Sequence, residues 1–224
     1  MIKVHSSEFN YQYGDQIHFP YRISSLVAYI RSKEVLNKNF DFQKAGVLRE
    51  NVDEYIQECK DADILLCSCY VWNWEITNFL ASEVHKINPN CTIVFGGAHV
   101  PDFSEDFFEE HPYVDFIVHG EGEIVLEEFL TAYMGDKNYS DVKGLETKEF
   151  RNPPQNRIND LDSLPSAYLT NTVWDLVDKI DGINWIAGWE TNRGCPYQCT
   201  FCDWGSATFT KVRKWEESKI FKEI

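Results

Sequence analysis

The chain has 224 residues, of which 43% are hydrophobic and 25% are charged, and its formal net charge at pH 7 is −15. This acidity argues against a nucleic-acid partner, because binding to a phosphate backbone depends on clustered Lys and Arg. No apolar run reaches the length of a membrane span, and no charged segment followed by an apolar stretch opens the chain, so we expect a cytoplasmic protein without a membrane partner. Seven cysteines, an odd and partly clustered number, fit a reducing compartment and a metal site better than a disulfide framework.

Short apolar runs alternate with amphipathic helical patterns along the first 135 residues. This alternation is typical of an α/β fold, here a Rossmann-like doubly wound parallel sheet. Asn73 is the expected N-cap of one helix, and Cys59 falls on the apolar stripe of another, where it is a core residue. The expected strands are 2–5, 40–47, 63–69, 91–95 and 114–118, and the expected helices are 23–30, 52–59, 76–87, 104–110 and 125–133.

Three of the expected strands end in unusual loops. The first is the aromatic turn Tyr70-Val71-Trp72-Asn73-Trp74, the second is Gly96-Gly97, and the third is Gly120-Glu121-Gly122. Parallel strands joined by helices present their carboxyl ends at one edge, so these loops are expected to converge on one crevice. Glycine there allows a large flat ligand to approach the backbone closely. The alternative is that the glycines only make tight turns between strand and helix.

Residues 136–184 are interpreted as a connector, in which Asn152-Pro153-Pro154 breaks any helix and a small hairpin begins near Val142. The run Trp185 to Thr191 is rich in aromatic and branched residues and predicts a strand that ends where a cysteine-rich loop begins. Its thiols would then lie at the carboxyl end of a β-strand, where α/β folds place their chemistry.

Cys195, Cys199 and Cys202 lie within eight residues, at spacing C-x3-C-x2-C. Cysteine thiolates suit zinc and iron–sulfur clusters, and either centre normally takes four ligands. Three thiolates leave one iron of a cluster with an open position for a reacting ligand. The alternatives are a zinc or redox cysteine cluster, or three unrelated thiols. The four remaining cysteines lie far upstream in expected core elements: Cys59, Cys67, Cys69 and Cys91.

This loop, with an aromatic residue before its last cysteine, resembles the signature of radical S-adenosylmethionine (radical SAM) enzymes. The resemblance implies that Cys195, Cys199 and Cys202 hold a [4Fe–4S] cluster whose fourth iron is chelated by SAM. It also implies that Phe201 lies against the adenine of SAM. In that family an external electron donor drives reductive cleavage of SAM to a 5′-deoxyadenosyl radical.

The order of elements over residues 1–135, with its glycine turns, resembles the cobalamin (B12)-binding domain of B12-dependent radical SAM proteins. The Asp-x-His-x-x-Gly motif that gives cobalt a lower histidine ligand in many cobalamin proteins is absent. We therefore expect Trp72 or Trp74 to cover the lower face of the corrin. The cobalamin contacts that the resemblance implies are Tyr70, Trp72, Trp74, Gly96, Gly97, Gly120, Glu121 and Gly122.

Together these resemblances imply a cobalamin-dependent radical SAM enzyme, most simply a methyltransferase acting on a small-molecule or peptide substrate. The expected domains are a cobalamin-binding domain at 1–135, the connector at 136–184 and the start of a radical SAM domain at 185–224. Only 22 residues follow Cys202, whereas the barrel that such enzymes resemble takes about 250 residues. We therefore expect the chain to be part of a longer protein and inactive alone.

Other functions stay open at the level of sequence. The chain could serve only as a cobalamin-binding module, or belong to a radical SAM enzyme that performs cyclisation or rearrangement. A methylthiotransferase is a further alternative, but that type needs another set of cluster cysteines in its N-terminal domain. The spacing of Cys59, Cys67, Cys69 and Cys91 does not provide such a set.

Overall fold

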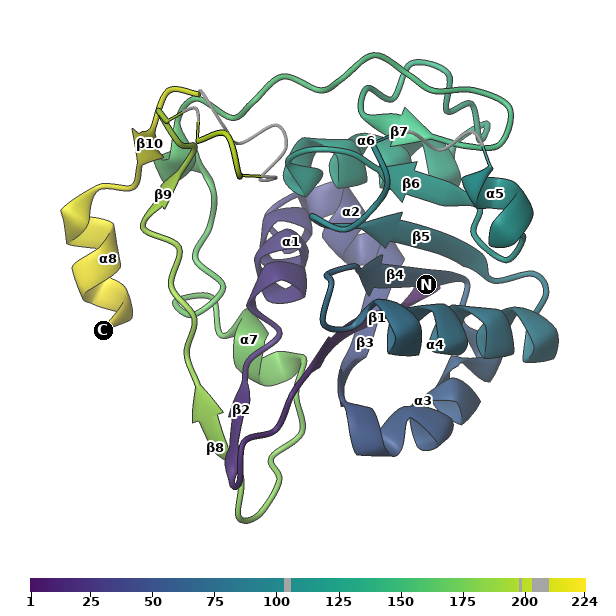
Figure 1. The fold of residues 1–224 in the computed structure, drawn as a ribbon, viewed down its shortest axis with the longest axis horizontal. Helices are drawn as coiled ribbons and strands as arrows, with labels where there is room; N and C mark the ends of the chain where they lie inside the picture. Colours follow the sequence, from purple (N-terminus) through teal and green to yellow (C-terminus); the bar gives the residue numbers. More distant parts are fainter. Residues whose placement is uncertain (103–105, 198, 203–209) are drawn as a thin grey trace.

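The computed structural model describes residues 1–102, 106–197, 199–202 and 210–224 (Figure 1). Its main feature is a six-stranded sheet in the order β3-β1-β4-β5-β6-β7. The first five strands in this order are parallel, and β7 pairs with β6 in the antiparallel direction. The strands are β1 (Ile2–Asn10), β3 (Phe40–Leu48), β4 (Ile64–Ser68), β5 (Thr92–Gly96), β6 (Phe116–Val118) and β7 (Leu145–Glu146).

The strand order contains one reversal. From β1 the chain moves to β3 on one side, and then returns to β4 on the other side of β1. In doubly wound α/β sheets, ligands bind at the carboxyl ends of the two strands where the order reverses. Here that point lies between the ends of β1 and β4.

Helices cover both faces of the sheet (Figure 1). Leu66 and Val94 face a core that contains residues of α1 and α6. Their neighbours Leu65 and Ile93 face a second core that contains residues of α3, α4 and α5. The expected doubly wound arrangement is therefore confirmed for the main sheet. The helices are α1 (Tyr21–Arg31), α2 (Glu34–Asn39), α3 (Val52–Glu58), α4 (Trp74–Ile87), α5 (Phe107–Glu110) and α6 (Gly122–Met134), with short 3-10 turns at Arg49–Asn51 and Cys59–Asp61.

Two details differ from the sequence-based expectation in this part of the chain. The first strand was expected to end at His5, but it continues through Ser6, Ser7 and Glu8 to Asn10 because these polar side chains are buried and paired with β3 and β4. The helix expected at 104–110 is α5, which begins at Phe107; residues 104 and 105 lie outside the described residues.

The connector folds back onto the main domain. Residues Ile17 and Phe19 share a small core with Val173 and with Ala28 of α1, and Trp185 packs against it. This contact is accompanied by a two-stranded parallel sheet of β2 (Gln16–His18) and β8 (Asn184–Ile186). The connector also contains a 3-10 turn (Leu161–Ser163) and α7 (Thr172–Asp175).

The prediction of a strand over residues 185–191 is wrong in its length. The structure has a strand only at Asn184–Ile186, because β8 pairs with the three residues of β2 and the described chain gives 187–191 no ladder partner. A separate strand, β9 (Asn192–Arg193), precedes the cysteine loop and pairs with β10 (Arg213–Lys214). The last helix is α8 (Glu217–Glu223). None of the helices in the described ranges is long and apolar enough to cross a membrane.

Candidate functional site

The turn after β4 is closed by a buried amide. Asn73 is fully buried; its Oδ1 accepts a hydrogen bond from the Tyr70 amide at 2.8 Å, and its Nδ2 donates one to the Ser68 carbonyl at 2.8 Å. Asn73 was expected to cap α4, and it does stand at that position, but its side chain makes no capping bond. Its amide is used instead to fold the aromatic turn back on the end of β4.

Tyr70 and Trp72 form a stacked pair at this turn. Their ring centroids are 4.6 Å apart and the rings are inclined by 15°. The guanidinium of Arg22, near the start of α1, lies 4.2 Å from the Tyr70 ring centroid and 5.6 Å from that of Trp72. Arg49, just after β3, donates a hydrogen bond to the Trp72 carbonyl at 2.9 Å. The aromatic pair is thus held by cations from two neighbouring elements.

Glu8 binds Arg22 from the end of β1. It lies at the end of β1 with only 1% of its surface exposed, and it accepts hydrogen bonds from the Arg22 and Ile23 amides, each at 3.0 Å. The Arg22 side chain is 3.3 Å from its carboxylate. Burial raises the pKa of Glu8, while Arg22 and the two amides oppose that rise. The ends of β1 and β4 are therefore bridged by a carboxylate, a guanidinium and two aromatic rings.

Trp74 lies apart from this pair. It is the first residue of α4, and its ring packs edge-on against Phe95 and His99, at centroid distances of 5.9 and 5.1 Å. Trp74 is therefore part of the packing between α4, β5 and α5, whereas Trp72 has 36% of its surface exposed. Of the two tryptophans, the structure favours Trp72 as the residue available to a ligand.

The turn after β5 is joined to the end of β4. The Cys69 amide donates to the Gly96 carbonyl at 2.6 Å, and the His99 amide donates to the Cys69 carbonyl at 3.1 Å. Gly97 has φ of +114°, and a Cβ there would lie 2.6 Å from the Cys69 carbonyl oxygen. The tight turn alone accounts for Gly97; the role of Gly96 and Gly97 in binding cobalamin stays a prediction.

The turn after β6 has a different environment. Gly120 has φ of +79°, and a Cβ there would meet no atom within 4 Å. Gly122 begins α6, where a Cβ would lie 3.1 Å from Leu26. Glu121 accepts a hydrogen bond from the Ile158 amide at 2.9 Å and forms an ion pair with Arg213, and its expected contact with cobalamin stays a prediction. Its carboxylate is thus bound by one residue of the connector and by one residue of β10.

The cysteine loop leaves its thiols accessible. Cys199 is exposed, Cys195 and Cys202 are partly exposed, and none of them is in a disulfide. The Cys202 amide donates to the Cys199 carbonyl at 3.0 Å, and Phe201 is 88% exposed. Within the described ranges no three Cys, His, Asp or Glu side chains are gathered as metal ligands. Gln198 and residues 203–209 of this loop lie outside those ranges.

The other four cysteines are buried in the core on one face of the sheet. Burial raises the pKa of Cys67 and Cys91 to about 12, and it raises the pKa of Cys59 and Cys69 as well. A thiol with such a pKa does not readily form the thiolate that binds metal. The expectation that these cysteines are core residues is confirmed, and the three in the loop form a separate set.

A comparison with protein-family models identifies the fold at this site. The B12 binding domain model matches residues 15–130, which is more than half of the chain. The chain belongs to the B12-binding domain family. The match includes all three strand-end turns, 70–74, 96–97 and 120–122, and it also includes Arg22.

Two relatives of this B12-binding domain protein are methyltransferases by name, and one of these names includes radical SAM. It is 39% identical over 206 residues to the cobalamin-dependent radical SAM methyltransferase TokK of Streptomyces tokunonensis, covering 89% of this chain and 30% of TokK. It is 39% identical over 192 residues to 2-(S-pantetheinyl)-carbapenam-3-carboxylate methyltransferase of Streptantibioticus cattleyicolor, covering 83% of this chain and 28% of that protein.

A third relative is the anaerobic magnesium-protoporphyrin IX monomethyl ester cyclase of Cereibacter sphaeroides. It is 33% identical over 170 residues, which cover 65% of this chain and 25% of the cyclase. The chain thus spans about 30% or less of the length of these curated relatives.

Residues in two parts of this chain fit the two expected cofactors: the B12-binding domain fits cobalamin, and the cysteine loop fits an iron–sulfur cluster. For cobalamin, the Tyr70–Trp72 stack lies at the strand reversal, and Gly120 leaves open space beside its backbone at a neighbouring strand end. For an iron–sulfur cluster, three accessible free thiols in one short loop provide a suitable set of soft donors.

Sequence reasoning missed Glu8, Arg22, Arg193 and Arg213. None of the four had a local signal, because the burial of Glu8 and an ion-pair partner of each arginine come from other segments of the chain.

Proposed function

We propose that the chain serves in a cobalamin-dependent radical SAM enzyme that transfers a methyl group to an unactivated carbon of its substrate. The observation that carries this proposal is the presence, in one chain, of a B12-binding domain and an accessible C-x3-C-x2-C loop. The names of the two methyltransferase relatives, each 39% identical to this chain, support it.

Cys195, Cys199 and Cys202 would hold the [4Fe–4S] cluster, and the exposed ring of Phe201 would pack against SAM. Once deprotonated, the three thiols supply three of the four positions, so the remaining iron is left for SAM. When bound, such a cluster supplies the electron for cleavage of SAM, and cobalamin supplies the methyl group that is transferred.

The domain would place cobalamin at the carboxyl edge of the sheet. The stacked rings of Tyr70 and Trp72 offer a flat apolar surface there, and Arg22 packs against them. Trp72 would lie on the lower face of the corrin and keep water from it. Gly120 allows the corrin to approach the backbone, because a side chain there would project into open space.

The cyclase relatives favour a second candidate, in which the same two cofactors serve a cyclisation. Two of them are 33% and 28% identical to this chain over 65% and 92% of its length, against 39% identity for each of the two methyltransferases, so methyl transfer is the better supported.

Two separate titrations test the proposal. Anaerobic reconstitution with iron and sulfide should give about four of each per chain, and the Cys199→Ala variant should retain little of either. Binding of hydroxocobalamin, followed by its visible spectrum, should weaken in Trp72→Ala and stay near wild type in Trp74→Ala. Uptake of zinc without sulfide would contradict the cluster, and unchanged cobalamin spectra and affinity in Trp72→Ala would contradict the placement of the corrin.

A further inference from the structure

The cysteine loop is closed by two short arms. Strand β9 pairs with β10 in the antiparallel direction, so that Arg193 lies directly opposite Arg213. Beside this ladder the Thr210 amide donates to the Cys195 carbonyl at 2.7 Å. Gly194 has φ of +100°, and a Cβ there would lie 2.6 Å from the Lys211 carbonyl oxygen. Cys195, the first expected cluster ligand, therefore stands at the point where the two arms meet.

The arms cannot be stable by themselves. Like charges directly opposite each other in an antiparallel pair are destabilising, and here both residues are arginines. The ladder is also only two residues long on each side, whereas an isolated two-stranded hairpin is marginal even when longer. A further interaction must hold Arg193 and Arg213 together.

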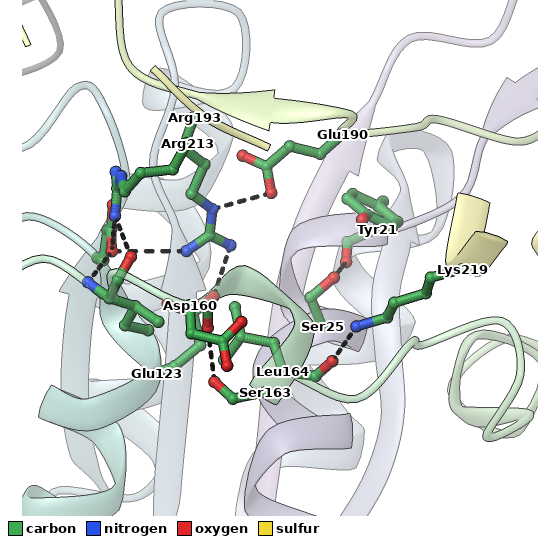
Figure 2. Close-up of polar contacts among 12 residues, drawn as sticks. Tyr21, Ser25, Glu123, Asp160, Ser163, Leu164, Glu190, Arg193, Arg213 and Lys219 are labelled. Atoms are coloured by element: carbon green, nitrogen blue, oxygen red, sulfur yellow. Dashed lines mark hydrogen bonds and ion pairs between the residues drawn. The ribbon is translucent and has the colours of Figure 1, made fainter. Parts of the chain in front are cut away.

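Two carboxylates of the B12-binding domain provide that interaction. Glu121, at the turn after β6, forms an ion pair with Arg213 and lies 3.8 Å from the Arg193 guanidinium. Glu123, in the first turn of α6, binds Arg193 at 2.6 Å (Figure 2). Glu121 thus lies between the two guanidinium groups and offsets their mutual repulsion.

These ion pairs are largely withdrawn from solvent. Glu123 is 4% exposed and Arg213 is 8% exposed. Arg213 also donates to the Ile158 carbonyl, and Glu190 binds the Arg193 Nε at 3.1 Å (Figure 2). Charges buried to this degree are strongly destabilising when one partner is removed, because the other is left without compensation. Removing one carboxylate here should therefore cost more than removing one partner of a solvent-exposed ion pair.

We propose that Glu121 and Glu123 are positioning residues that close the arms of the cysteine loop, so that the loop is formed only when it is docked on the turn after β6. The inference rests on the proposed function in one respect: it takes Cys195, Cys199 and Cys202 as the cluster ligands. It adds that the B12-binding domain itself assembles the cluster site.

The same turn also borders the expected corrin. Gly120, with open space beside it, directly precedes Glu121. One short segment of the domain, residues 120–123, therefore adjoins the cobalamin region on one side and fixes the arms of the cysteine loop on the other. This placement fixes the position of the cluster loop relative to the cobalamin edge of the sheet.

The test uses amide hydrogen exchange of the purified 224-residue chain, without metal. In the double variant Glu121→Gln/Glu123→Gln, amides in peptides covering 192–195 and 210–214 should exchange at least about tenfold faster, as expected for loss of buried charge pairs. Amides of β4 and β5 should exchange as in wild type, which shows that the sheet is intact. The single variant Glu123→Asp keeps the negative charge. Its arms should therefore keep part of the exchange protection that the double variant loses.

The matched control is Asp175→Asn, which removes another ion pair between distant segments, Arg31 to Asp175 at 2.8 Å, away from the loop. It should leave the exchange of the two arms unchanged. Wild-type exchange of the arms in Glu121→Gln/Glu123→Gln would overturn the inference.

A second measurement separates this inference from the proposed function. During anaerobic reconstitution the double variant should take up iron and sulfide about tenfold more slowly than wild type, with Asp175→Asn as the control. Cys199→Ala should lose the cluster while keeping the protection of the arms. Normal uptake by the double variant would overturn the positioning role, whereas absence of a cluster in wild type would contradict only the proposed function.

Discussion

The guanidinium carbon of Arg22 lies 4.2 Å from the centroid of the Tyr70 ring, and it thereby joins the start of α1 to the turn after β4. These two elements flank the point where the strand order reverses. Because Arg22 is also bound by the buried carboxylate of Glu8, its position is fixed before any ligand arrives. A preformed surface of this kind reduces the ordering cost of binding a large cofactor.

We expect Arg22→Gln to lower the free energy of unfolding by roughly 1–3 kcal/mol, because it leaves the buried Glu8 carboxylate without its cation. Urea unfolding followed by circular dichroism measures this change. The control is Arg31→Gln, which breaks a more exposed ion pair with Asp175 and should cost less than about 1 kcal/mol. Equal effects in the two variants would show that Glu8 does not depend on Arg22.

Glu8 should also make stability depend on pH. Burial raises its pKa above the ordinary value of 4.5, so the folded chain binds its proton more tightly than the unfolded chain. Its contribution to stability is complete below the unfolded pKa and is lost as pH rises through the raised folded pKa. The difference in unfolding free energy between wild type and Glu8→Gln should therefore fall as pH rises above 4.5. A difference that increases with pH would contradict this assignment.

Gly97 and Gly120, both with positive φ, should respond differently to alanine. Gly97→Ala combines a left-handed conformation with a clash against the Cys69 carbonyl, so we expect a loss of at least about 2 kcal/mol in stability. Gly120→Ala meets no protein atom and should cost only about 1–2 kcal/mol from the backbone. Thermal unfolding compares the two. If Gly120 adjoins cobalamin, Gly120→Ala should weaken cobalamin binding. The loss in binding free energy should then exceed the loss in unfolding free energy.

The seven cysteines should divide into two classes on alkylation. Iodoacetamide should modify Cys195, Cys199 and Cys202 in the folded, metal-free chain, because they are at least partly exposed. The buried set, whose pKa values are raised, should react only after unfolding: Cys59, Cys67, Cys69 and Cys91. Mass spectrometry of the peptides gives the result, and modification of Cys67 or Cys69 in the folded chain would contradict the described core.

Sequence patterns predicted the main sheet because its determinants are local. The continuous apolar run of β4 and the stripe of α4 each identify an element without reference to any other. The end of β1 was missed because Ser6, Ser7 and Glu8 are polar, although all three are buried. Their burial depends on strands that follow much later in the chain.

Long-range pairing explains the other differences. Strand β8 is short because its partner, β2, has three residues and lies near the other end of the chain. The arginines that flank the cysteine loop find Glu121 and Glu123 more than sixty residues away, a separation that no local pattern records. The thiol spacing, in contrast, is entirely local, which is why the three candidate ligands were identified from sequence alone.

The most direct test of the proposed chemistry is electron paramagnetic resonance of the anaerobically reconstituted and reduced chain, with and without SAM. If Cys195, Cys199 and Cys202 leave one iron open, a [4Fe–4S] signal should appear and SAM should change it, while Cys199→Ala should give neither. A chain that binds zinc instead of iron and sulfide, or an iron–sulfur signal that excess SAM leaves unchanged, would contradict the proposal.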